Sequence, residues 1–514
     1  MAGWVARPII YEINTWVWLN TLSRIHQQPL RLDSVPDAAL DELAALNIDA
    51  VWLMGVWQRS PAARQSALNY THEYRPVLPD LTDDDVIGSA YAIGAYEVDE
   101  RLGGRHGLAR LRQRLQDRGI KLILDFVPNH VAADHPWISS RPVYFVRANH
   151  REFKRHRSKF FAAQDAWGRA LYVAHGRDPY FPGWIDTAQL NAFSPAYRQA
   201  ATDTLLDIAS QCDGVRCDMA MLMLNSVFAN TWGDYLEEEL PETDFWQEII
   251  PHVKAQHPGF AFIAEVYWGL EGVLLQQGFD WTYDKTLYDR IGEGDVQKIR
   301  DHLRAPLTYQ KRTVRFIENH DEPRAMTSFG LEKSRAAAAL LCTLPGAVLL
   351  HDGQLAGRKI KLPVQIKRQP DEPIDESLRA FYGQLLSEAR SAIYQTGEWR
   401  LFDVQPSFQG NDTNANLLAC GWQDGAERRL IVVNLTGAWS HGIVKLGAWD
   451  GVSSSDWCLH DVLADVYYYR PAHQINGGGL YVELKPYTAQ VFRFERIEEG
   501  RTMEYPCQLF TQAH

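Results

Sequence analysis

The 514-residue sequence predicts an α/β fold in which strands and helices alternate around a barrel of parallel strands. Four apolar segments each end in charged or histidine side chains, as buried parallel strands do at their carboxyl ends. Helical patterns with short links separate these segments, which favours right-handed crossovers in one parallel sheet. In such a barrel the carboxyl ends of several strands meet at one site.

The first 130 residues contain the clearest alternation. Apolar runs predict strands at Ile9–Ile13, Ile48–Val56 and Lys121–Phe126. Before the second strand, Ser34 and Asp37 are expected to form the N-cap and box partner of a helix. The strand–helix order predicts that the barrel begins here.

The alternation stops over residues 131–190, which are rich in aromatic residues and lack a clean period. We expect a small inserted domain, because an ordinary loop is shorter. Its basic run, Arg147–Lys159, is either a solvated face or a site for an acidic or phosphorylated ligand. Helical pattern resumes where Ser194 can cap a helix and Pro195 suits its first turn.

The remaining organisation follows from a change of pattern near residue 394. Residues 1–130 and 191–393 are predicted to form the barrel, and residues 131–190 the inserted domain. Residues 394–514 contain β-branched runs separated by Gly, Asn and Asp turns, which predict a C-terminal antiparallel β-sandwich domain.

Composition excludes several classes of protein. A net charge of −12 argues against nucleic-acid and anionic-membrane partners, which need a positive surface. The six cysteines lack zinc-site or disulfide-scaffold spacing, so we expect buried free thiols. The sequence shows no secretion signal and no uninterrupted apolar segment long enough for a membrane span, so we expect a cytoplasmic protein.

Carboxylates at the strand ends indicate the chemistry. Arg216 and Asp218 lie two apart, so both face one side, where the guanidinium would lower the pKa of Asp218 and suit a nucleophile. Glu265 follows the apolar run Phe260–Ala264, and an apolar pocket would help it hold a proton. With Asp321 as a third carboxylate, the set suits glycoside cleavage.

The segments DFVPNH, GVRCD, FIAEV and FIENHD, in this order, resemble the motifs of the alpha-amylase superfamily, glycoside hydrolase family thirteen. The resemblance implies a (β/α)8 TIM barrel, a small domain after the third strand and a C-terminal antiparallel β-domain. It also implies that Asp218 is the nucleophile, Glu265 the acid/base and Asp321 the transition-state stabiliser.

Six further residues match family positions in or beside the substrate site. By this resemblance Tyr91 stacks on the sugar, two histidines hydrogen-bond to it, and an arginine positions the nucleophile. An aspartate of the first motif supports the site, and a second arginine lies near the leaving-group sugar. The six substrate-binding candidates are Tyr91, Asp125, His130, Arg216, His320 and Arg324.

Three positions depart from the family pattern. Met221 and Leu222 replace a Lys-His pair on the leaving-group side, which argues against an ordinary starch-cleaving amylase. Gln189 replaces an aspartate that helps to bind calcium in many members, although Asn129 of that site is present. Hard cations prefer carboxylate ligands, so we expect no metal and no cofactor. Leu355 replaces a glutamate near the eighth strand.

The sequence therefore predicts a retaining glycoside hydrolase that cleaves α-glucosidic bonds in short α-glucans or small α-glucosides by double displacement. The alternative is a transglycosylase or phosphorylase-type glucosyl transfer through the same covalent intermediate. A third class, a non-enzymatic binding or transporter-partner subunit, typically lacks the carboxylates that this chain keeps. The expected partner is a small-molecule carbohydrate, and the sequence does not predict the oligomeric state. The basic segment Arg358–Arg368 either lines the pocket mouth or faces water.

Overall fold

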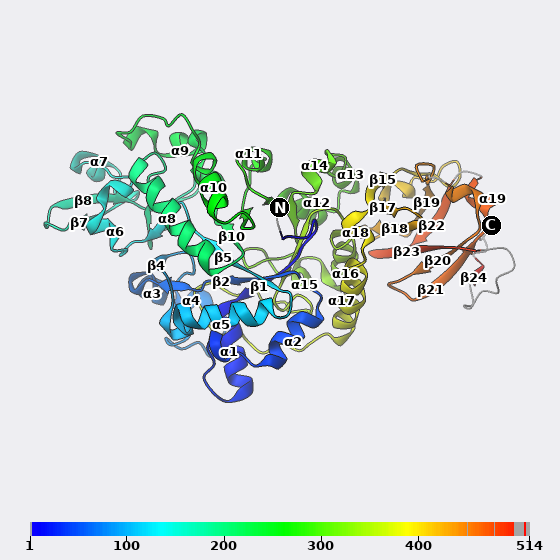
Figure 1. Ribbon diagram of the computed structural model, residues 1–514, viewed down its shortest axis with the longest axis horizontal. Coiled ribbons are helices and arrows are strands. Elements are labelled where there is room, and N and C mark those ends of the chain that lie inside the picture. The colour runs from blue at the N-terminus through cyan, green and yellow to red at the C-terminus, as the bar shows by residue number, and fades with distance from the viewer. Residues whose placement is uncertain (1–2, 450, 477–478, 498–507, 510–514) are drawn as a thin grey trace. The chain divides into compact units, whose positions relative to one another are not determined.

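A closed barrel of eight strands forms the centre of the fold. The computed structural model describes residues 3–449, 451–476, 479–497 and 508–509. The barrel strands follow the order β1–β14–β13–β12–β11–β10–β5–β2, which confirms the predicted barrel. Figure 1 labels β1, β2, β5 and β10 of these strands. Their bounds are β1 Ile9–Asn14, β2 Ala50–Met54, β5 Lys121–Phe126, β10 Gly214–Cys217, β11 Ala261–Ala264, β12 Trp281–Tyr283, β13 Thr313–Arg315 and β14 Ala347–His351.

Burial explains why these short segments form parallel strands. Every residue of β2, β10, β11 and β14 is buried, as expected for strands covered on both faces. The pairing of β10 with β5 places Arg216 opposite Asp125, and its pairing with β11 places Arg216 opposite Ile263. This register brings the polar ends of three strands into one neighbourhood.

Amphipathic helices connect the barrel strands. Ser194 accepts a hydrogen bond from the backbone of Tyr197 and Pro195 occupies the first turn of α8, which confirms that predicted helix start. The principal helices are α1 Thr15–His26, α2 Asp37–Ala45, α5 Gly104–Gln116, α8 Pro195–Gln211, α10 Phe245–Gln256, α12 Lys285–Glu293, α13 Val296–Leu303, α16 Gly330–Leu341 and α17 Glu376–Ala389. Shorter helices are α3 Pro61–Leu68, α4 Thr71–Tyr74, α9 Asn225–Trp232, α11 Glu271–Gln276, α14 Leu307–Gln310, α15 Ala325–Ser328 and α18 Ile393–Thr396.

The predicted cap of α2 was wrong. The helix begins at Asp37 after Pro36, and Ser34 instead ends a 3-10 turn, Leu32–Ser34, where its hydroxyl accepts from the Arg31 backbone at 2.8 Å. A residue before proline disfavours the helical region. Pro36 therefore separates Ser34 from the helix.

Residues 131–190 contain two small antiparallel ribbons. The strand β6 (His130–Ala132) pairs with β9 (Thr187–Gln189), so the start and the end of this segment are joined. The second ribbon pairs β7 (Phe160–Gln164) with β8 (Ala170–Ala174). The helices α6 (Trp137–Ser140) and α7 (His150–Arg155) complete the segment, and β3 (Trp57–Arg59) pairs with β4 (Ile93–Val98) before it.

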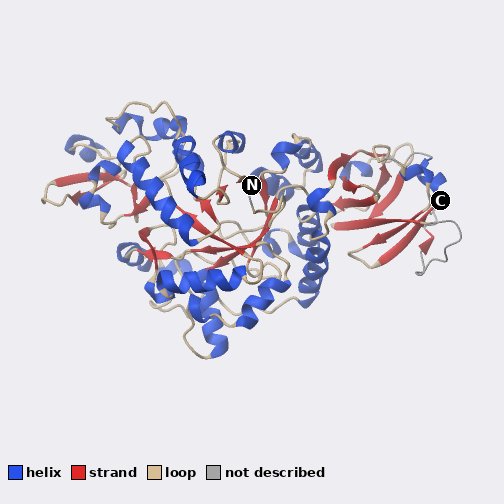
Figure 2. Cartoon of the chain, viewed as in Figure 1, coloured by secondary structure: helices blue, strands red, loops and turns tan. Residues whose placement is uncertain are grey.

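The chain divides into two compact units. The first comprises Met1–Trp4, Ile10–Tyr283 and Ile360–Asp371, and the second Val5–Ile9, Asp284–Lys359 and Glu372–His514. The C-terminal part of the second unit is built mainly of strands (Figure 2), which confirms the predicted antiparallel sheet domain.

Two sheets make up this C-terminal part. The seven-stranded sheet contains β15 (Glu398–Phe402), β17 (Leu417–Asp424), β18 (Glu427–Asn434), β23 (Thr488–Arg496), β20 (Trp457–Asp461), β21 (Val466–Arg470) and β24 (Gln508–Leu509), and the three-stranded sheet β16 (Val404–Gln405), β19 (Ser440–Val444) and β22 (Leu480–Leu484). Strands of both sheets contribute to one hydrophobic core, which includes Phe492 and Val482. A short helix, α19 (Ala472–Asn476), follows β21.

A buried glutamate on α17 holds the C-terminal sheets to the helices of the second unit. Glu388 is buried and accepts hydrogen bonds from Arg429 of β18 at 2.8 Å and from Arg493 of β23 at 2.9 Å. Tyr394 also donates to it, at 3.1 Å. One carboxylate thus joins α17 to two neighbouring strands.

Two composition-based expectations can be compared with the described residues. Cys212, Cys217, Cys342 and Cys420 are free and buried, as predicted; Cys458 is also buried, and Cys507 lies outside the described residues. No helix in the described part of the chain combines the length and apolar character needed to cross a membrane.

Candidate active site

Arg216 and Asp218 form a close ion pair at the end of β10. The Nη1 atom of Arg216 lies 2.6 Å from the Oδ1 atom of Asp218. Both side chains are buried, and only 1% of the Arg216 side chain is exposed. The structure thus brings together the two side chains that the sequence places on one side of the strand, and the role of Asp218 as nucleophile stays a prediction.

Glu265, directly after β11, binds the other arm of the same guanidinium. Its Oε2 atom lies 2.8 Å from Nη2 of Arg216 and accepts from the backbone of Met219 at 2.6 Å. Tyr267 donates to Oε1 at 2.7 Å. The prediction that Glu265 lies in an apolar pocket was wrong, because its partners are polar groups from β10, from the residues directly after β10 and from Tyr267.

Arg216 is held in a cage of aromatic rings. Its guanidinium carbon lies 5.2 Å from the ring centre of Trp52, 5.3 Å from Tyr91 and 5.8 Å from Tyr283. Burial alone lowers the pKa of Arg216, but the charge of Glu265 and its other neighbours raise it well above the usual value. The guanidinium is therefore a fixed positive charge between two carboxylates.

Asp125 supports the site from β5. Its two carboxylate oxygens accept from the indole nitrogen of Trp52 and the backbone of Gly55, each at 3.1 Å. The closest Arg216 nitrogen lies 4.0 Å away. These contacts agree with the supporting role that the sequence analysis gave Asp125, and direct contact with a substrate stays a prediction.

His130 and Tyr91 lie together in the same unit. A hydrogen bond links His130 to the Tyr91 backbone, and the His130 ring lies 5.0 Å from that of Trp184. Burial lowers the pKa of His130 from 6.5 to about 4, although its hydrogen bond to Tyr91 raises it. The imidazole is neutral at neutral pH and can both donate and accept.

Asp321 and His320 follow β13, in the second unit. The Nε2 atom of His320 lies 3.0 Å from Oδ2 of Asp321, whose side chain is 46% exposed. Asn319 accepts from the backbones of Asp321 and Glu322, each at 2.9 Å. This turn fixes the backbone and leaves the Asp321 carboxylate accessible.

Arg324, directly after this turn in sequence, is buried in a polar cluster. Its Nη1 atom donates to Glu318 at 2.7 Å and to the Asp352 backbone at 2.7 Å, and it lies 2.9 Å from His351. Glu318 also accepts from the Ala325 backbone, at 2.7 Å. These contacts indicate a supporting position, and the contact with a leaving-group sugar implied by the resemblance stays a prediction.

Met219, whose backbone donates to Glu265, and two aromatic residues of the same unit were missed in the sequence. Met219 adopts a left-handed backbone (φ 42°) directly after Asp218, and Trp268 does so (φ 64°) three residues after Glu265. Such strained positions in non-glycine residues concentrate at functional sites. The exposed rings of Tyr180 and Trp268 lie 5.0 Å apart, edge to face. Proximity of Trp268 to Glu265 in sequence was the available signal.

The departures from the family pattern have local structural explanations. Met221 and Leu222 are buried in a 3-10 turn, Ala220–Met223, so they are part of the core.

The two basic segments can also be located. Arg368 pairs with Asp85 at 2.8 Å, so this end of the basic segment 358–368 neutralises acidic residues. In the other basic run, most side chains of α7 are exposed.

Gln189 determines the fit of a calcium ion. Its amide nitrogen donates to the backbone oxygen and to Oδ1 of Asn129, both at 2.8 Å, and to the Leu190 backbone at 3.0 Å. These are oxygens that would face a cation, and an amide N–H group already satisfies them. Over the described residues, no group of three His, Cys, Asp or Glu side chains is arranged to hold a metal. The residues present do not fit calcium.

Comparisons with known proteins agree with this arrangement. Residues 37–372 match the family model for the alpha-amylase catalytic domain. The chain is 28% identical over 396 residues to Alpha-amylase MalA of Haloarcula japonica, covering 75% of this chain and 49% of that protein. It is 23% identical to Probable oligo-1,6-glucosidase 2 of Bacillus subtilis, covering 62% of this chain and 60% of that protein.

The fold is also similar to solved structures. An alpha-amylase from Lactobacillus plantarum aligns with a TM-score of 0.66 and 19% identity, over 95% of this chain and 99% of that one. At this identity the likeness supports the fold. Because the catalytic-domain model matches most of the chain, and the barrel carries the expected motifs at its strand ends, this protein belongs to the alpha-amylase family.

Proposed function

We propose that this protein is a retaining glycosidase that hydrolyses α-glucosidic bonds in short α-glucans or small α-glucosides. The observation that carries the proposal is the guanidinium of Arg216, bonded to Asp218 at 2.6 Å and to Glu265 at 2.8 Å. Two carboxylates fixed on neighbouring strand ends are the groups that double displacement requires. The names of the relatives, amylase and glucosidase, support the same class of reaction.

In the first step, a carboxylate oxygen of Asp218 attacks the anomeric carbon. The bond from that carbon to the glycosidic oxygen breaks, and Glu265 gives its proton to the leaving oxygen. The sugar is then held to Asp218 as an ester. In the second step Glu265 takes a proton from water, the water oxygen bonds to the anomeric carbon, and the ester bond to Asp218 breaks. Two inversions retain the α configuration.

Arg216 holds the carboxylates of the site in one neighbourhood. Its guanidinium lies 4.0, 2.6 and 2.8 Å from Asp125, Asp218 and Glu265. This fixes the distance between the two carboxylates to which the mechanism gives the roles of nucleophile and acid/base.

The sugar-binding roles are proposed on family positions and on accessibility. Asp321, with its exposed carboxylate, would hold sugar hydroxyls in the transition state. His130 and His320 would hydrogen-bond to the same sugar, and Tyr91 would stack on it. Asp125 and Arg324 would act indirectly, through the residues to which they hydrogen-bond.

The exposed pair Tyr180 and Trp268 favours a second candidate function. Trp268 follows Glu265 by three residues, and its exposed ring forms with Tyr180 an aromatic pair that offers flat faces to an acceptor sugar. If such a sugar replaced water in the second step, the enzyme would transfer glucosyl groups instead of hydrolysing them. This is the transglycosylase alternative, with the same covalent intermediate.

One experiment tests both functions. The protein is incubated with maltose, maltodextrin, sucrose, trehalose and glucosylated polyols, and the products are followed by proton NMR. We expect the α-anomer to be released first. Initial release of the β-anomer would exclude the retaining mechanism, and longer or isomeric sugars would favour transfer. Asp218→Asn and Glu265→Gln should each lower turnover by about two to four orders of magnitude, while Asp203→Asn, on exposed α8 surface, should not.

A further inference from the structure

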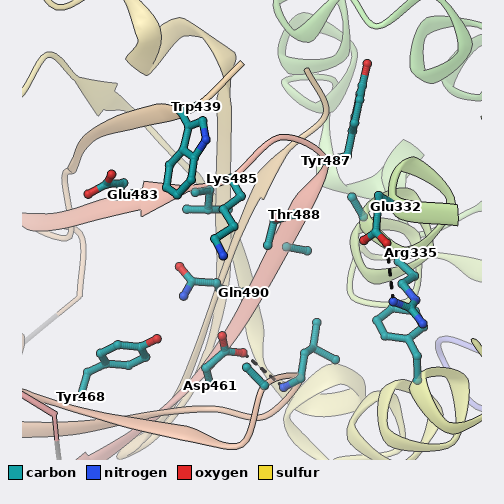
Figure 3. Close-up of a pocket in the computed structure, with 16 residues that line it drawn as sticks. Glu332, Arg335, Trp439, Asp461, Tyr468, Glu483, Lys485, Tyr487, Thr488 and Gln490 are labelled. Carbon is teal, nitrogen blue, oxygen red and sulfur yellow. Dashed lines mark hydrogen bonds and ion pairs between the residues drawn. The ribbon is translucent and has the colours of Figure 1, made fainter. Parts of the chain in front are cut away.

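A cavity of about 580 Å³ lies within the second unit, between α16 and the C-terminal strands (Figure 3). Its volume falls within the range typical of small-molecule binding sites. None of its lining residues belongs to the candidate active site. The protein therefore has space for a ligand that the proposed mechanism does not use.

The floor of the cavity is a connected polar group. Asp461, at the end of β20, is only 2% exposed and accepts from the backbones of Leu463 at 3.2 Å and Val491 at 3.3 Å. The Gln490 side chain hydrogen-bonds to Asp461 and to Tyr468. With the Ala464 backbone, Asp461 has four hydrogen-bond donors, which hold it and the Gln490 amide in place. The Gln490 amide has more hydrogen-bonding capacity than these contacts use, so it can also bind a ligand hydroxyl.

Aromatic side chains form the walls. Trp439 is 56% exposed, and Figure 3 shows it with Tyr468 around the space beside Gln490. Tyr487 also lines the cavity, in the turn between β22 and β23, with a left-handed backbone (φ 51°). A non-glycine residue in that region is strained, which is common in binding sites. These rings provide flat apolar surface beside the polar floor.

The charges at the rim favour a neutral ligand. Glu332 and Arg335 on α16 lie 3.8 Å apart and compensate each other. Glu483 and Lys485, on the opposite wall, carry opposite charges, and the Lys485 ammonium lies 5.8 Å from the Trp439 ring centre. A strongly charged ligand would meet both signs in the same cavity, whereas hydroxyl groups can bond to either.

A sugar ring combines a flat face of C–H groups with a rim of hydroxyls that donate and accept. We propose that this cavity is a second binding site for a neutral oligosaccharide. The identity of the ligand rests on the proposed function, since the protein would meet α-glucans as substrates. Trp439 would stack on a sugar ring, and the Gln490 amide, which Asp461 holds in place, would bind its hydroxyls.

The test uses the full-length Asp218→Asn variant, in which turnover should be strongly reduced, and maltotriose as the probe. Isothermal titration calorimetry should detect two sites in this variant and one after Trp439→Ala or Gln490→Leu is added. Phe408→Ala, an exposed aromatic residue of the same part of the chain outside the cavity, should leave two sites. Circular dichroism would confirm that each variant is folded.

A single site in the Asp218→Asn variant, or two sites that persist after both Trp439→Ala and Gln490→Leu, would overturn the proposal. Hydrolysis by otherwise wild-type protein is measured separately. If no α-glucoside is cleaved but Trp439→Ala still removes one maltotriose site, the proposed function fails and the second site stands. If maltose is cleaved equally with and without Trp439→Ala and only one site is found, the proposed function stands and the second site fails.

Discussion

The Nε2 atom of Gln189 lies 2.8 Å from the Oδ1 atom of Asn129, and the same nitrogen bonds to two backbone oxygens. An uncharged amide therefore joins β9 to the loop after β5. The amide N–H groups of Gln189 therefore hold together oxygens that a bound cation would otherwise bridge.

We predict that chelators do not destabilise this protein and that Gln189→Glu does. A buried carboxylate would face the Asn129 and Leu190 oxygens without a partner, which should lower the free energy of unfolding by about 3 kcal/mol. Added Ca²⁺ should restore stability only in the variant, because a carboxylate completes an oxygen ligand set. Thermal unfolding with EDTA or Ca²⁺ measures both effects. Gln199→Glu, on exposed surface, is the control, and a lower Tm of wild-type protein in EDTA would contradict the prediction.

Arg216→Lys should lower turnover by about 10²–10³-fold, because an ammonium lacks the planar fork that reaches Asp218 and Glu265 together. The free energy of unfolding should also fall, since one buried carboxylate loses its partner. Steady-state kinetics and urea unfolding measure the two effects. Arg110→Lys, at an exposed position of α5, should change neither. Near-native turnover in Arg216→Lys would show that the shared guanidinium is dispensable.

Acidification should destabilise the protein through His130. Burial lowers the pKa of this imidazole from 6.5 to about 4, so between these pH values the unfolded chain binds a proton that the folded protein does not. The free energy of unfolding should therefore fall by about 3 kcal/mol as pH drops from 6.5 to 4. Urea unfolding across this range measures the slope, which should be smaller in His130→Gln. An equal slope in the two proteins would assign the effect to other groups.

Glu318 should act as a positioning residue for the turn that carries His320 and Asp321. In Glu318→Gln an amide replaces the carboxylate that binds Arg324 and the Ala325 backbone, leaving the buried guanidinium without its charge partner. We expect the free energy of unfolding to fall by about 3 kcal/mol and kcat to fall with little change in KM. Glu376→Gln, an exposed glutamate of α17 outside the cavity, is the matched control. Unchanged stability and kcat would leave Glu318 without this role.

The sequence was most informative where function and strand ends coincide. Parallel strands gave apolar runs, so the barrel and the ends that carry Asp218, Glu265 and Asp321 could be predicted. The surroundings of Glu265 could not, because its partners Arg216 and Met219 come from another strand end. For Glu265, the residues adjacent in sequence therefore led to a wrong prediction of its surroundings.

Other features depend on geometry that no pattern encodes. Gln189 was noted as a lost calcium ligand, but its three hydrogen bonds require the pairing of β6 with β9. Ser34 has the residue type and spacing of a cap, yet Pro36 moved the helix start away from it. The residue types were visible in the sequence, and their partners were set by tertiary structure.

The hydrogen bonds of Glu388 have a practical consequence for engineering. A chain shortened to residues 1–393 would keep this glutamate on α17 but lose Arg429, Arg493 and Tyr394. A charged group that is now shielded would be left on a newly uncovered helix face. Shuffling with related enzymes is therefore better done with α17 and the C-terminal sheets exchanged together, as one transplantable module.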